Sequence, residues 1–120
     1  MKKEILMGLT ALMLNCNSTP KYDTTAAKME LAKCLVREEA TMYGAEWCGY
    51  CRLEKKELGP AWGLLQKNYV DCTEDLQPCA EVATPAGIIS FPTWKFKNGN
   101  IVRSYTPNFL EVLAEESGCD

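Results

Sequence analysis

The sequence predicts an α/β domain in which a central mixed β-sheet is flanked by helices on both faces. Apolar residues change along the chain from helical spacing to short buried runs and back again. A strand–helix–strand segment, which requires parallel pairing, is followed by two strands joined through an Asn-Gly turn, which pair antiparallel. The chain has 120 residues, 47% of them hydrophobic, which suits one such domain with one core.

The first half of the chain predicts two helices around one strand. Thr24 or Thr25 can cap a helix that runs to about residue 38, with apolar residues at helical spacing. Residues 40–45 form a short apolar stretch that predicts a buried strand. Residues 48–58 predict a second helix, which a Gly-Pro pair ends or kinks before a further helical turn.

The second half predicts a strand, a short helix, a hairpin and a last helix. Residues 68–72 indicate the strand, and nearby prolines limit the next segment to a short helix around residues 79–83. Apolar and polar residues then alternate on both sides of the turn at residues 98–99, which predicts the hairpin. Thr106 followed by proline indicates the start of a helix that ends near Ser117.

The N-terminus differs from the rest of the chain. Residues 1–25 combine a basic start, a short apolar run and a polar exit, which is typical of an export signal, and we expect the folded domain at residues 26–120. Cys16 stands where a bacterial lipoprotein carries its lipidated cysteine, although Asn15 is a poor match to the small residue expected there. A frayed N-terminal helix with an unmodified Cys16 thiol is the alternative. Export would place the domain in a periplasmic or other extracytoplasmic, oxidising compartment, with a lipid on Cys16 as membrane anchor.

Net charge disfavours one class of partner. The chain carries a formal charge of −3 and shows no basic stripe, so we expect no nucleic-acid partner. We also expect a monomer.

Two cysteines carry the main chemical signal. Cys48 lies at a predicted strand–helix junction behind Trp47, where free backbone N–H groups and the helix dipole favour a thiolate. Cys51 follows one helical turn later and lies within reach of Cys48. Such a pair can attack a substrate disulfide through Cys48, form a mixed disulfide and resolve it through Cys51. The electrons reside on the two sulfurs, so we expect no metal and no cofactor.

The segment "MYGAEWCGYC", followed by "SFPTWKFKNGN", resembles the thioredoxin superfamily over residues 27–118. Within it, "YVDCTED", "AGIISFPTW" and "LAEESGC" look most like the thioredoxin-like domains associated with vitamin K epoxide reductase homologues. The resemblance implies a thioredoxin fold and a thiol–disulfide oxidoreductase. Its partners would be protein thiols and disulfides, or a membrane redox protein similar to vitamin K epoxide reductase.

The resemblance also implies roles for individual residues. Cys48 matches the attacking cysteine, Cys51 the resolving cysteine and Trp47 the tryptophan beside them. Pro92 matches the cis-proline opposite the cysteines, and the backbone of Phe91 would pair with an extended substrate. These residues would form a broad apolar surface rather than a sequence-specific one.

Two positions depart from the family pattern. Met42 stands where thioredoxins carry a buried aspartate that moves protons, and Lys67, which would match the neighbour of that acid, is expected at the surface. Without that acid, proton transfer would depend on water, Glu46 or the substrate. The charged run at residues 52–57 indicates a solvated helix face. Tyr50, between the cysteines, belongs to the expected substrate surface but does not fix whether the protein oxidises, isomerises or reduces.

The remaining cysteines of the domain are expected to form two structural disulfides. In the topology that the resemblance implies, Cys34 and Cys119 lie at the end of the domain opposite the active site. Cys72 lies at the active-site end, with Cys79 a short loop away. We therefore expect Cys34–Cys119 and Cys72–Cys79 bonds, the second of which could also act as a second redox pair. Four reduced, buried thiols are the alternative.

Two other classes of function remain open. Cys48, Cys51, Cys72 and Cys79 could together bind a structural zinc ion, although a plain helix rather than a glycine-rich turn follows the first pair. The domain could also be a non-catalytic binding module that docks peptides on Phe91, Trp94 and Tyr50.

Overall fold

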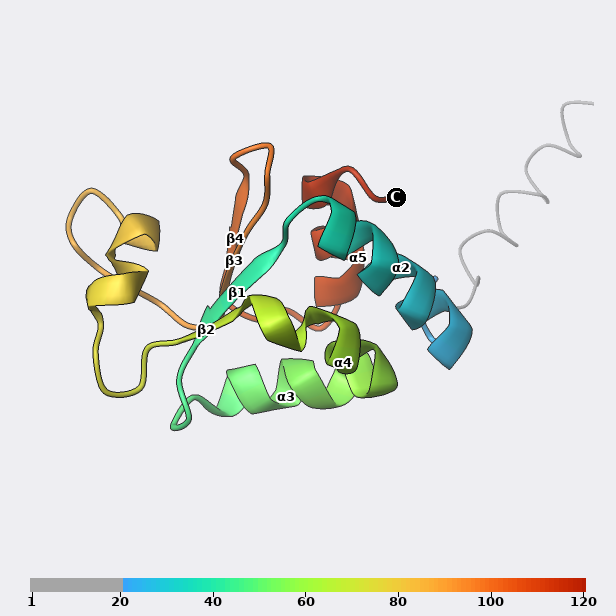
Figure 1. Ribbon diagram of the computed structural model, residues 1–120, viewed down its shortest axis with the longest axis horizontal. Helices are drawn as coiled ribbons and strands as arrows, with labels where there is room; N and C mark the ends of the chain where they lie inside the picture. Colours follow the sequence, from blue (N-terminus) through green and yellow to red (C-terminus); the bar gives the residue numbers. More distant parts are fainter. Residues whose placement is uncertain (1–20) are drawn as a thin grey trace, which may run out of the picture.

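The structure is a computed structural model that describes residues 21–120, so most of the expected leader, Cys16 included, lies outside the described residues. A four-stranded mixed sheet forms the centre of the domain (Figure 1). Its strands follow the spatial order β2–β1–β3–β4, with β1 parallel to β2 and antiparallel to β3, and β3 antiparallel to β4. The strands are β1 (Thr41–Gly44), β2 (Tyr69–Asp71), β3 (Thr93–Lys95) and β4 (Ile101–Arg103).

Residues 21–120 also contain four α-helices and three short 3₁₀ helices. The α-helices are α2 (Thr25–Arg37), α3 (Gly49–Leu58), α4 (Trp62–Leu65) and α5 (Phe109–Ser117). The 3₁₀ helices are η1 (Gly59–Ala61), η2 (Gln66–Asn68) and η3 (Gln77–Val82). None of the helices in residues 21–120 is both long enough and apolar enough to cross a membrane.

The two faces of the sheet are covered differently. Successive strand residues point to opposite faces, and Met42 and Trp94 share a large buried cluster with apolar residues of all four α-helices. Tyr43 points the other way and belongs to a small cluster with Cys72, Cys79 and Val82, so η3 covers this face. Figure 1 shows η3, in yellow, on the opposite side of the strands from α2 and α5.

The mixed α/β sheet and a thioredoxin-like arrangement are therefore confirmed. One helix start predicted from the sequence is wrong, because α5 begins at Phe109 with Asn108 as its N-cap. The backbone N–H of Phe109 donates to the Thr106 carbonyl at 3.0 Å, so the Thr-Pro pair forms a turn before the helix rather than its first residues.

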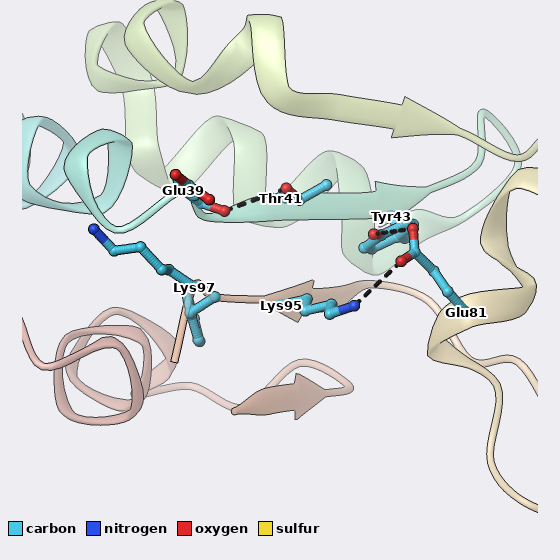
Figure 2. A pocket seen from close by; sticks show the side chains of 7 residues that line it. Glu39, Thr41, Tyr43, Glu81, Lys95 and Lys97 are labelled. Carbon is cyan, nitrogen blue, oxygen red and sulfur yellow. Dashed lines mark hydrogen bonds and ion pairs between the residues drawn. The ribbon is translucent and has the colours of Figure 1, made fainter. Parts of the chain in front are cut away.

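The short η3 is fixed to the sheet by a polar network (Figure 2). The Tyr43 hydroxyl donates to Glu81 at 2.9 Å, and the Lys95 ammonium lies 3.1 Å from the other oxygen of the same carboxylate. Burial, reinforced by Glu81, raises the pKa of Tyr43 to about 12, so the phenol remains a donor across the neutral range. Beside this network lies an open hollow of about 370 Å³, also lined by Glu39 and Thr41.

Candidate functional site

Cys48 caps the N-terminus of α3. Its backbone is extended, and its sulfur accepts the backbone N–H of Cys51 at 3.1 Å. A hydrogen bond from a free N–H at the positive end of a helix stabilises negative charge on that sulfur. The Arg52 guanidinium donates to the Glu46 carbonyl and so adds a cation to the loop that leads into the helix. The local structure therefore favours a thiolate at Cys48.

Cys51 lies one turn further along α3 and is bonded to Cys48. The two Cα atoms are 5.3 Å apart, within the range of protein disulfides. Cys51 is fully buried, whereas 7% of Cys48 is exposed, so a substrate can approach the pair only from the side of Cys48. The sequence assigned attack to Cys48 and resolution to Cys51, and this difference in exposure agrees with that order.

Gly44 allows the close packing behind Cys51. A Cβ atom at this position of β1 would lie 3.0 Å from the Cys51 sulfur and 3.0 Å from the Tyr69 hydroxyl. The sulfur and the phenol oxygen therefore both lie close to the Cα of the glycine. A larger residue at this position would have to displace one of them.

Aromatic side chains surround the exposed side of the pair. Trp47 is 63% exposed and makes an edge contact with Phe91, with ring centroids 5.7 Å apart. Tyr50 is 59% exposed and stacks on Tyr105 at 5.2 Å. Exposed aromatic rings held in place by other rings are typical of protein-binding surfaces.

The segment before β3 lies beside this surface. The Phe91–Pro92 peptide bond is cis, Pro92 is buried, and the Pro92 carbonyl accepts the Ser104 N–H at 2.9 Å. Phe91 packs against both clusters and reaches Trp47. The structure thus brings together the six site residues predicted from the sequence: Trp47, Cys48, Tyr50, Cys51, Phe91 and Pro92.

One residue of the site was missed by sequence reasoning. Glu54 follows Cys51 on α3 and is only 1% exposed, so the prediction of a solvated face over residues 52–57 is wrong at this position. The Trp94 indole N–H donates to the Glu54 carboxylate at 2.8 Å. Burial is the main cause that raises the Glu54 pKa to about 7; the nearby Glu57 adds to the rise, and the indole hydrogen bond opposes it. The spacing of Cys51, Glu54 and Leu58 along one helix face was the signal that could have revealed it.

Glu46 and Lys67 are not buried as Glu54 is. Both side chains are exposed, on the loop before Cys48 and in η2. Met42 is buried, as expected for the residue that replaces an acid in β1. The buried acid of the site is therefore Glu54, on α3 rather than on β1.

The other four cysteines of the domain form two further disulfides. Cys34 is bonded to Cys119 and Cys72 to Cys79, with Cα–Cα distances of 5.9 and 6.3 Å, in the pairs that the sequence analysis expected. Cys72 and Cys79 are completely buried in the small cluster on the η3 face.

The position of Cys72 and Cys79 tests the hypothesis that they bind a structural zinc ion together with Cys48 and Cys51. Cys48 and Cys51 belong to the large cluster on the opposite face, so the four sulfurs do not converge. Within residues 21–120, no three His, Cys, Asp or Glu side chains gather as a metal site would require.

Comparison with curated proteins shows a similarity to a plant protein. The chain is similar to the thiol-disulfide oxidoreductase LTO1 of Arabidopsis thaliana, with 42% identity over 72 residues. The match covers 53% of this chain and 18% of the relative, so the chain spans less than one fifth of that protein's length. No protein-family model matches the sequence.

Proposed function

We propose that the protein is a thiol–disulfide oxidoreductase that exchanges disulfides with protein substrates through Cys48 and Cys51. The observation that carries the proposal is the position of Cys48 at the N-cap of α3, with its sulfur accepting the N–H of a buried, bonded Cys51. The similarity to a named thiol-disulfide oxidoreductase supports the same reaction.

In the reductive direction, the Cys48 thiolate attacks one sulfur of a substrate disulfide and expels the other as a thiolate. Cys51 then attacks Cys48 in the mixed disulfide, releases the substrate as a second thiolate and leaves the Cys48–Cys51 bond. The reverse sequence oxidises a substrate dithiol. The exposed rings of Trp47 and Tyr50 offer apolar contact on either side of the reacting sulfur, which suits flexible or unfolded polypeptides.

We also propose that the protein works in an oxidising, extracytoplasmic compartment, with a membrane redox protein of the vitamin K epoxide reductase type as one partner. Two disulfides besides the active-site pair support the compartment, because such bonds persist where thiols are not kept reduced. The partner is supported by the resemblance of the segments around the cysteines and β3.

Trapping tests the reaction. In a chain with Cys16→Ser, a further Cys51→Ser change should accumulate a covalent adduct with a disulfide-bonded protein substrate such as insulin, whereas a further Cys48→Ser change should give none. A Cys34→Ala, Cys119→Ala double variant is the matched control and should retain insulin reduction, because that disulfide lies outside the active site. Equal adduct formation by both active-site variants, or none by either, would contradict the proposal.

Further measurements separate the alternatives. One mole of bound zinc per chain would support a metal site, and peptide binding that survives loss of both active-site sulfurs would support a binding module. Equilibration of the pair with glutathione gives its reduction potential and therefore the favoured direction of exchange.

A further inference from the structure

Glu54 is a buried carboxyl group without a cation. The ion pairs among residues 21–120 join Lys33 to Glu30 and Lys95 to Glu81, and neither involves Glu54. Removing a charged carboxylate from water is unfavourable unless a cation or several hydrogen bonds compensate it. Here the compensation for Glu54 is one indole N–H. A group kept in such a place next to reactive sulfurs is a candidate for a chemical role.

The position of Glu54 is fixed by α3 and β3. Cys51, Glu54 and Leu58 are the buried residues of α3, and residues three apart on a helix lie side by side on one face, with Cβ atoms roughly 5–6 Å apart. The indole that binds Glu54 belongs to Trp94, whose register partner in β1 is Met42. Glu54 therefore lies on the same buried face of α3 as Cys51, where that face meets Trp94 of β3.

We propose that Glu54 accepts the proton of the Cys51 thiol when Cys51 resolves the mixed disulfide, and returns that proton when the reaction runs backwards. This inference rests on the proposed function. In the forward step the Cys51 S–H bond breaks and the Glu54 carboxylate takes the proton. The Cys51 thiolate forms a bond to the Cys48 sulfur, the Cys48–substrate bond breaks, and the substrate leaves as a thiolate that is protonated by solvent.

The raised pKa of Glu54 suits a reversible proton transfer with the Cys51 thiol. A group with a pKa near the working pH is present in both forms, so it can take a proton and give it back. An exposed glutamate with an ordinary pKa is a weaker base and would accept the thiol proton less readily.

The titratable groups that face Glu54 and Cys51 come from three elements. Glu57 of α3 raises the Glu54 pKa, and Tyr105, which precedes α5, donates to Glu57 at 2.9 Å. Tyr69 of β2 lies beside the Cys51 sulfur, with the Lys55 ammonium 3.8 Å from its ring centroid. Residues from α2, α4 and α5 in the large cluster are apolar.

A single-turnover experiment separates the two chemical steps. The full chain with the single change Cys16→Ser, and with Cys48 and Cys51 reduced, is mixed with oxidised glutathione from pH 5 to pH 9 and quenched with acid, and intact masses are recorded. The mass increase from one glutathione reports attack by Cys48, and its loss reports resolution by Cys51. For the wild type we expect the resolution rate to show an inflection near pH 7 that belongs to Glu54.

In the Glu54→Gln variant the resolution rate at pH 7 should fall roughly 10²-fold and the inflection should disappear, while attack by Cys48 is unchanged. The glutathione adduct should therefore accumulate. Glu57→Gln is the matched control on the same helix. It should keep fast resolution and move the inflection to lower pH, because a negative neighbour has been removed.

Trp94→Phe gives an independent test if the glutamine variant fails to fold. Loss of the indole hydrogen bond should move the inflection to higher pH. Two results would overturn the role of Glu54 and leave the proposed function intact. One is resolution by Glu54→Gln at the wild-type rate and with the wild-type pH profile, and the other is an unmoved inflection in Trp94→Phe. Failure of the reduced wild type to react with oxidised glutathione at any pH, with neither an adduct nor a Cys48–Cys51 bond formed, would instead overturn the proposed function.

Discussion

The burial of Glu54 should make the stability of the domain depend on pH, and Glu54→Gln should remove that dependence. The pKa of this carboxyl group rises from 4.5 to about 7 on folding. At about 1.4 kcal/mol for each pH unit, the difference corresponds to about 3 kcal/mol of folding free energy. The side chain is almost fully buried, so solvent screening does not reduce this figure substantially.

The sign follows from which state holds the proton more tightly. Below pH 4.5 Glu54 is protonated in the folded and the unfolded chain. As the pH rises from 4.5 to about 7, the unfolded chain loses the proton first, so the free energy of unfolding falls. Above that range the folded domain contains a buried carboxylate and the full contribution is lost. Glutamine does not ionise, and its amide oxygen can still accept the Trp94 N–H.

Urea denaturation of the oxidised protein at pH 4.5 and pH 8 measures this effect. The wild type and the Glu54→Gln variant should have nearly equal free energies of unfolding at pH 4.5. At pH 8 the free energy of unfolding of the variant should be higher by about 3 kcal/mol. Asp71 and Glu81, whose pKa values are lowered by hydrogen bonds, titrate in both proteins and cancel in the comparison. A difference in unfolding free energy that is the same at both pH values would refute the argument.

Three further changes test other parts of the structure. Replacing both Cys34 and Cys119 with alanine opens a loop of 85 residues and should lower the unfolding free energy by roughly 4 kcal/mol, measured by urea denaturation. Gly44→Ala places a Cβ 3.0 Å from the Cys51 sulfur and should destabilise the domain by roughly 1–3 kcal/mol. It should also slow closure of the active-site disulfide, which mass spectrometry measures. Tyr43→Phe removes the hydrogen bond to η3 and should cost about 1 kcal/mol, with faster amide exchange in that segment.

Local sequence signals predicted most of the fold. Thr24 caps α2 because its side chain accepts the Ala27 N–H, and α3 ends where Gly59 has a positive φ. The start of α5 could not be predicted in the same way, because Thr106 followed by proline suits both a helix start and a turn. Packing of Phe109 into the core selects the turn and the later start.

The site was predicted unevenly because its residues give signals of different kinds. Cys48 and Cys51 are rare residues at a characteristic spacing, so the sequence alone made them candidates, and the structure places them together. Glu54 sits in a run of lysines and glutamates, where charge predicts solvent. Only the tertiary structure shows that this position of α3 faces Trp94 while its charged neighbours Lys56 and Glu57 point more toward water.

The placement of the buried acid on α3 rather than on β1 has a consequence for the whole site. Cys48, Cys51 and Glu54 then follow one another along a single helix, at its N-cap and on its buried face. A helix fixes those spacings by its backbone hydrogen bonds, so the acid keeps its place beside Cys51 whatever residue occupies Met42. Burial is the main cause of the raised pKa of this carboxyl group, and the hydrogen bond from the Trp94 indole of β3 lowers that pKa again. Substitutions at that contact should therefore affect proton transfer more than substitutions in the strand beneath the cysteines.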